Sequence, residues 1–292
     1  MGSGAEPTRI TVAGERPYDV VVGRHLLGEL PALLDGAGRV LVVHPRALAV
    51  TAEAVREDLS AAGFQTLLAE VPDAEEAKTS QVAAFCWGVL GQAGFTRSDA
   101  VVGLGGGATA GLAGFVGASW GRGIRTVLVP TTVVGMVDAA IGGKTAINTA
   151  EGKNLVGAFW APAGVLCDVA ALETLPANDR VAGLAEVVKH GFIADERTLQ
   201  LIEADPAALT GPELTDLDLV TELVERSVTV KARVVGADFR ESFLREVLNY
   251  GHTLGHAIEQ VERYRWRHGA AAAVGIAFPA EPAPLAPRLR AD

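Results

Sequence analysis

The stretch "DAVVGLGGGATAGLAG", residues 99–114, decides the fold of the first half of the chain. An apolar, β-rich run leads into a cluster of glycines, and small residues suited to a helix follow. Such a strand–turn–helix unit lets backbone N–H groups and a helix N-terminus approach a pyrophosphate. The spacing Gly103-x-Gly105-x-x-Ala108 is a relaxed form of the dinucleotide fingerprint, so tight packing of the turn explains the glycines equally well.

Strands and helices alternate on both sides of this unit, which predicts a parallel, Rossmann-like sheet. The predicted strands cover residues 18–23, 39–45, 65–72 and 125–132, and the predicted helices cover 49–63, 73–94 and 112–123.

From about Thr174 the pattern becomes helical, with helices predicted at residues 180–195, 198–204, 217–239 and 242–264. We therefore predict an α/β Rossmann-like domain at residues 1–173 and an all-α domain at 174–292. Four prolines in the last fifteen residues cannot continue a helix, so a loose tail is expected there.

The composition excludes several classes of protein. Hydrophobic residues make up 49% of 292, yet no apolar stretch reaches the ~18 residues of a membrane helix. The N-terminus lacks a signal pattern, which predicts a cytoplasmic protein with no membrane partner. The only cysteines, Cys86 and Cys167, predict no disulfide framework. A net charge of −10 argues against binding to nucleic acid.

Positive charge comes from twenty arginines and only five lysines. Because this chain uses arginine for generic positive charge, a retained lysine suggests a need for a compact ammonium with a tunable pKa. Chance and ordinary surface positions remain alternatives for any single one. The lysines are Lys78, Lys144, Lys153, Lys189 and Lys231.

Two histidines, His252 and His256, lie four residues apart in "LNYGHTLGHAIEQ", residues 248–260. On one predicted helix they share a face, with Asn249 and Glu259 near it. This pattern fits a pair of metal ligands, and it fits hydrogen-bonded structural histidines as well.

Thr253 occupies the position where a helical zinc-protease motif carries glutamate, which excludes that class. A catalytic zinc needs about three N/O ligands and an open position. His268 and Glu186 are further candidates, and Lys189 follows Glu186 by one helical turn. His190 projects to another face and is interpreted as structural.

Taken together, the motifs resemble those of the 3-dehydroquinate synthases, sugar-phosphate cyclases of the shikimate pathway, in their actinobacterial form. The matching stretches run in family order from about residue 10 to 278 and include "PDAEEAK", "VPTTVVGMVDAAIGGKTAIN", "EGKNLVGAFWAP", "GLAEVVKHGFIAD", "LREVLNYGHTLGHAIE" and "YRWRHGAA". The resemblance implies an NAD-binding Rossmann-like domain, a helical domain holding a divalent metal (zinc, with cobalt as the alternative), and a homodimer.

The resemblance also assigns roles to residues. Metal ligands would be Glu186, His252 and His268. Catalytic groups would be Lys144, Lys189, Glu241 (a proton acceptor) and His256. The sugar-phosphate substrate would be bound by Arg122, contributed across a dimer interface, and by Asp138, Lys144, Asn154, Lys189, Lys231, Arg245 and Asn249. NAD would be bound by Glu75, Lys78, Gly106, Gly107, Ala108, Thr131, Thr132, Lys153 and Thr174.

The implied reaction converts 3-deoxy-D-arabino-heptulosonate 7-phosphate to 3-dehydroquinate and phosphate, with NAD restored in each turnover. Departures from the family are Gly111, where the family carries aspartate, and a shortened C-terminus, which predicts exposed apolar helix faces. Alternatives are an aminodehydroquinate or 2-deoxy-scyllo-inosose synthase, a metal-dependent polyol dehydrogenase, or an impaired paralogue that acts as a binding partner.

Overall fold

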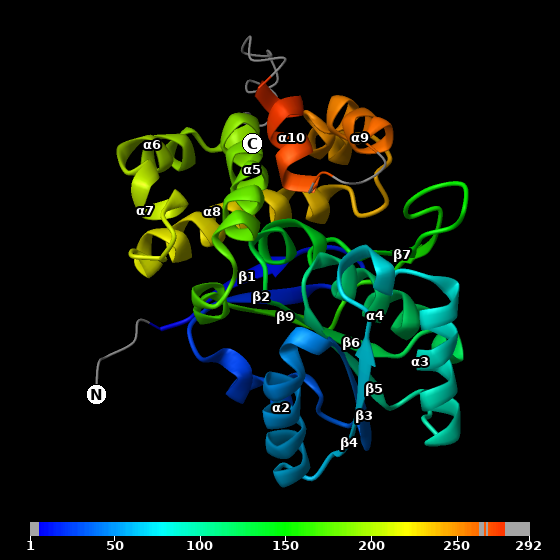
Figure 1. Ribbon diagram of the computed structural model, residues 1–292. Coiled ribbons are helices and arrows are strands. Elements are labelled where there is room, and N and C mark those ends of the chain that lie inside the picture. Colours follow the sequence, from blue (N-terminus) through cyan, green and yellow to red (C-terminus); the bar gives the residue numbers. More distant parts are fainter. Residues whose placement is uncertain (1–5, 263–265, 267, 278–292) are drawn as a thin grey trace.

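The computed structural model describes residues 6–262, 266 and 268–277. A seven-stranded sheet with helices on both faces carries a group of helices above one end (Figure 1). The strand order is β1-β2-β9-β6-β5-β3-β4. The bounds are β1 Thr8–Val12, β2 Tyr18–Gly23, β3 Arg39–Pro45, β4 Gln65–Val71, β5 Ala100–Gly105, β6 Arg125–Pro130 and β9 Gly164–Asp168.

The predicted strands are confirmed as β2 to β6, but the prediction of a purely parallel sheet was wrong. The edge strand β1 pairs antiparallel with β2, while the other neighbours in this sheet pair in parallel. Sequence analysis missed β1, β9 and a separate hairpin of β7 (Lys144–Ile147) and β8 (Val156–Phe159). Strand β8 is exposed throughout, so it carries no alternating apolar signal.

Two hydrophobic clusters lie on the two faces of the sheet. Along β3, Leu41 and Val43 belong to one cluster while Val40 and Val42 belong to the other, as the two-residue period of a strand requires. Helices α1 (Leu30–Leu33) and α2 (Ala49–Ala61) cover the second cluster, and α3 (Ser80–Gln92) and α4 (Gly107–Ser119) cover the first.

Two predicted helices have different bounds. The helix predicted at 73–94 begins only at Ser80, because the Thr79 hydroxyl caps it by accepting from Val82 N at 3.2 Å. The helix predicted at 112–123 begins at Gly107 and ends before Gly121, whose φ of 54° is left-handed.

The helical part comprises α5 (Ala177–Ala194), α6 (Glu196–Ala204), α7 (Pro206–Thr210), α8 (Leu217–Ala237), α9 (His252–Val261) and α10 (His268–Ala277). Helix α8 packs on β1 and β2, and one hydrophobic cluster contains both Val20 of the sheet and Val228 of α8. Because this core crosses the boundary proposed at residue 173, the two-domain division stays a prediction. No helix in the described ranges is long and apolar enough to span a membrane.

The single helix predicted at 242–264 is wrong. Residues Leu244–Asn249 form a 3-10 helix, η7. Gly251, whose φ of 78° is left-handed, then separates η7 from the start of α9. A Cβ on Gly251 would also lie 2.6 Å from Ile276 Cγ1. Asn249 therefore does not share a helix with His252, and its position depends on η7.

Helices α5, α10 and α9 approach one another through glycines. A Cβ on Gly269 would lie 1.9 Å from Ala182 O of α5, and one on Gly275 would lie 2.0 Å from Gly251 O at the start of α9. These backbone-to-backbone contacts let α10 pack closely against both α5 and the start of α9, and so bring those two helices near each other.

Gly269→Ala is expected to destabilise the protein by about 3 kcal/mol, because the methyl group overlaps a backbone carbonyl that cannot rotate away. Gly88→Ala in α3 is the matched control: its Cβ meets open space, so the helix should gain roughly 0.5–1 kcal/mol. Urea unfolding of both variants measures the difference, and equal stabilities would contradict the close packing.

The exposure of apolar helix faces predicted from the shortened C-terminus stays a prediction. Exposed apolar side chains occur throughout the described residues, from Phe85 of α3 to Phe192 of α5 and Val274 of α10.

Candidate active site

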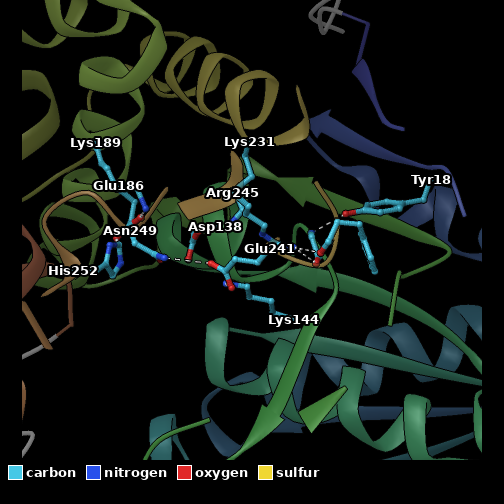
Figure 2. Close-up of polar contacts among 12 residues, drawn as sticks. Tyr18, Asp138, Lys144, Glu186, Lys189, Lys231, Glu241, Arg245, Asn249 and His252 are labelled. Atoms are coloured by element: carbon cyan, nitrogen blue, oxygen red, sulfur yellow. Dashed lines mark hydrogen bonds and ion pairs between the residues drawn. The ribbon is translucent and has the colours of Figure 1, made fainter. Parts of the chain in front are cut away.

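Helix α5 presents Glu186 and Lys189 one turn apart, both almost fully buried, and the lysine ammonium donates to Oε2 of Glu186. His252 opens α9, and its Nε2 lies 3.4 Å from the other carboxylate oxygen, Oε1 (Figure 2). The structure thus brings together two of the three residues predicted to bind metal, which lie on different helices and are 66 residues apart in the sequence.

The spacing of this pair fits a metal. Two atoms each about 2.0–2.1 Å from a tetrahedral zinc are about 3.4 Å apart, and a carboxylate oxygen with an imidazole nitrogen is a donor set zinc accepts. Within the described residues no group of three or more candidate ligand side chains is found. The side chain of His268, the third predicted ligand, and that of His256 lie outside the described residues, so both roles stay predictions.

A second buried ion pair joins the sheet to the helices. Asp138 lies in the π-helix η5 (Gly135–Ala139) after β6, and the ammonium of Lys231 in α8 donates to it. Burial alone would raise the pKa of Asp138, but the ammonium groups of Lys231 and Lys189 outweigh burial and hold this pKa below its usual range. Burial lowers the pKa of Lys231.

Arg245 is held by residues that sequence reasoning missed. Its Nη1 donates to Gly142 O at 2.9 Å and to Phe239 O at 2.7 Å, while Asp238 accepts from Arg245 N at 3.1 Å. Gly142 N in turn donates to the hydroxyl of Tyr18 at 2.9 Å, and burial raises the pKa of Tyr18 to about 12. Of these residues, Asp238 alone carried a sequence signal for its role, because aspartate readily caps turns. Nothing in the sequence around Tyr18 indicated that it supports Arg245.

Glu241, Lys144 and Asn249 line a cavity of about 1030 Å³ between η7, α9 and α10. The ammonium of Lys144 pairs with Glu241, and Asn249 Nδ2 donates to the same carboxylate at 3.3 Å. Burial would raise the pKa of Glu241, but the hydrogen bond and charge of Lys144 outweigh it and lower this pKa. Figure 2 shows this group beside Asp138 and the Glu186–His252 pair.

Part of the predicted nucleotide-binding set lies at the start of α4. Gly106 precedes its first turn, Thr131 N donates to Gly105 O at 2.9 Å, and Thr132 Oγ1 accepts from Gly135 N at 3.1 Å. Thr174 donates to Ala171 O within its own turn at 3.2 Å.

Asn154, predicted to bind substrate, contacts a residue predicted to bind the nucleotide, and its own role stays a prediction. It accepts from Lys78, whose pKa is lowered by burial, and the neighbouring Lys153 contacts Glu259 of α9 at 3.3 Å. Glu259, near the histidine face but without an assigned role, thus acquires a partner.

Arg122 does not join this cleft. It lines a separate cavity of about 460 Å³ with Arg16, Arg97, Arg125 and Trp160. It is not among the residues that line the cavity around Glu241.

The surroundings of His190 fit the interpretation that this residue is structural. It is fully buried, neither ring nitrogen has a hydrogen-bond partner among the described residues, and burial, reinforced by the charge of Lys189, lowers its pKa to about 3. The imidazole is therefore neutral near pH 7.

Comparison with solved structures identifies the fold. A 2-deoxy-scyllo-inosose synthase complexed with carbaglucose-6-phosphate, NAD+ and Co2+ is 26% identical with a TM-score of 0.83, over 92% of this chain and 75% of that one. The 2-epi-5-epi-valiolone synthase of Streptomyces hygroscopicus, with NAD+ and Zn2+ bound, is 27% identical with a TM-score of 0.82, over the same shares. A probable glycerol dehydrogenase from Sinorhizobium meliloti, at 20% identity and TM-score 0.64 over 87% of this chain and 73% of its own, shares the fold alone.

Closer relatives come from sequence. The 3-dehydroquinate synthase of Streptomyces avermitilis is 63% identical over 286 residues, covering 97% of this chain and 78% of the relative, and that of Streptomyces coelicolor is 62% identical over the same shares. Residues 68–182 match the 3-dehydroquinate synthase N-terminal family and residues 183–289 the C-terminal family. The chain therefore belongs to the 3-dehydroquinate synthase family.

Proposed function

We propose that this protein is a 3-dehydroquinate synthase, which converts 3-deoxy-D-arabino-heptulosonate 7-phosphate to 3-dehydroquinate and phosphate. The observation that carries the proposal is the gathering of Lys144, Lys189, Lys231 and Arg245 around the Glu186–His252 pair in an otherwise acidic chain. Such a cluster suits a small substrate bearing phosphate and carboxylate.

The proposed cofactors are NAD and a divalent metal, which structural neighbours bind as NAD+ with Co2+ or Zn2+. When bound, they supply a reversible hydride acceptor and a Lewis acid. Glu186 and His252 would hold the metal, with His268 as the predicted third ligand. The residues around the first turn of α4, with Lys78 and Lys153, would hold the nucleotide.

The remaining residues would orient substrate and move protons. Arg245 is locked by two backbone carbonyls, so its remaining N–H groups are preorganised for a carboxylate. Glu241 is kept ionised by Lys144, as a proton acceptor requires.

Another sugar-phosphate cyclase is the second candidate, because the structural neighbours include a 2-deoxy-scyllo-inosose synthase. Lys231 and Arg245, the cations expected at the carboxylate end, favour 3-dehydroquinate synthase. The separate cavity of Arg122 supports the proposal that this arginine serves a second subunit of a homodimer.

The test is incubation of the purified protein with NAD, zinc and the heptulosonate phosphate. The expected result is stoichiometric release of phosphate and 3-dehydroquinate without net NADH. Phosphate release without dehydroquinate would contradict the proposal. NADH accumulation with simple polyols would favour a dehydrogenase, and absence of NAD binding would favour an impaired paralogue.

Gly111→Asp is expected to tighten NAD binding about fivefold, since it restores the carboxylate of the family beside a buried lysine. A Cβ at Gly111 would lie 3.9 Å from Lys78 Nζ, with no contact shorter than 3.7 Å. A fivefold change in affinity corresponds to about 1 kcal/mol, the contribution of one added hydrogen bond. Gly111→Ala is the control: it should gain helix stability without changing NAD affinity. Calorimetric titration measures both, and equal affinities would contradict the prediction.

A further inference from the structure

Helix α9 touches two different parts of the cleft. Its first residue, His252, faces Glu186 of α5. Seven residues later, on the same face two turns along, the carboxylate of Glu259 lies 3.3 Å from Lys153 Nζ. Glu259 is only 3% exposed, so its charge needs a cationic partner. That partner comes from the connection between β7 and β8, 106 residues earlier in the chain.

The connection that carries Lys153 is itself tied to the nucleotide side. Asn154 accepts from Lys78, and its backbone N donates to Asn148 Oδ1 at 3.0 Å. Asn148 N donates to Lys78 O at 2.7 Å, and Asn148 Nδ2 donates to Glu75 at 2.7 Å. Lys153 is close enough for its charge to lower the pKa of Lys78. A continuous set of polar contacts thus runs from α9 to residues predicted to bind NAD.

We infer that Glu259 is a positioning residue that couples the metal site to the cofactor site through Lys153, an inference that rests on the proposed function. A metal held by Glu186 and His252 would add a direct link between α5 and the start of α9 to their packing through α10, and Glu259 lies on the same helix α9. Glu259 then restrains the flexible side chain of Lys153, a residue predicted to bind the nucleotide. When metal is present, the Lys153 side chain has therefore already lost part of the conformational freedom that it would lose on binding NAD.

This arrangement predicts positive coupling, which must be reciprocal: zinc raises the affinity for NAD by the same factor by which NAD raises the affinity for zinc. The ratio of the NAD dissociation constant without zinc to the one with zinc tests this coupling more directly than either constant alone. Removing the charge of Glu259 changes the electrostatic potential at the nucleotide with and without zinc, whereas only the coupling changes the ratio.

The experiment titrates NAD calorimetrically into chelator-treated protein, with and without added zinc. In the unmodified protein NAD should bind roughly tenfold more tightly with zinc. In Glu259→Gln the ratio should fall to about one. Glu222→Gln is the matched control, because it removes a helical ion pair with Arg226 on α8 that is more exposed and remote from the site; it should keep the tenfold ratio. Zinc titrations with and without NAD should give the same factors.

An unchanged ratio in Glu259→Gln, or no coupling in the unmodified protein, would overturn the inference. If the unmodified protein still turns over the heptulosonate phosphate, the proposed function survives that result; if it neither binds NAD nor turns over, both fail. Should Glu259→Gln fail to fold by circular dichroism, Glu259→Asp keeps the charge but shortens the reach by one methylene. A reduced ratio in that variant supports the coupling, and an unchanged ratio overturns it.

Discussion

His252→Ala is expected to release the metal and to lower kcat/KM by at least about a thousandfold, since Lewis-acid catalysis contributes several kcal/mol. The imidazole Nε2 lies 3.4 Å from Glu186 Oε1, the separation that two ligands of one zinc require. Without the imidazole, the buried carboxylate keeps its contact with Lys189 but loses the predicted partner ligand from α9. Metal content by inductively coupled plasma mass spectrometry and phosphate release measure the two effects on the same sample.

His256→Ala is the matched comparison, one turn further along α9. The role predicted for it is toward substrate, so this variant should keep its metal and lose turnover. Equal metal loss in both variants would overturn the division of roles between the two histidines. If neither variant lost its metal, His252 would not be a metal ligand.

Lys231→Met is expected to destabilise the protein by about 3 kcal/mol, because it leaves the carboxylate of Asp138 without its ion-pair partner. This value is at the low end for a broken buried pair, since the side chain of Asp138 is 27% exposed. Asp138→Asn combined with Lys231→Met should recover part of the loss. Urea unfolding of the single and double variants measures it, and a double variant no more stable than the single one would contradict the pairing.

The same pair predicts a dependence of stability on pH. The folded pKa of Asp138 lies below its unfolded value of about 3.9, so its stabilising contribution is complete above that value. It is lost as the pH falls from about 4 toward the folded pKa. The difference in unfolding free energy between the unmodified protein and Lys231→Met should therefore be larger at pH 6 than at pH 3. A difference independent of pH would contradict the shift assigned to Asp138.

The sequence alone was sufficient for the main elements of the sheet and for part of the site. Strands β2 to β6 and the turn before α4 follow from local apolar periodicity and glycine placement, which act within a few residues. The scarcity of lysine also proved informative. Each of the five pairs with a polar side chain, and three of them are buried.

Only the tertiary structure decided the contacts between segments distant in sequence. The close packing of Gly251 against Ile276 of α10 and the orientation of Arg245 by Gly142 are contacts of this kind. The pairing of Glu259 with Lys153 joins a helix to a hairpin that carried no strand signal. Local patterns determine which residues are strand, helix or turn, because those preferences arise between neighbours along the chain. Which side chains meet in the cleft depends on packing between elements, and that packing is fixed by contacts no local pattern records.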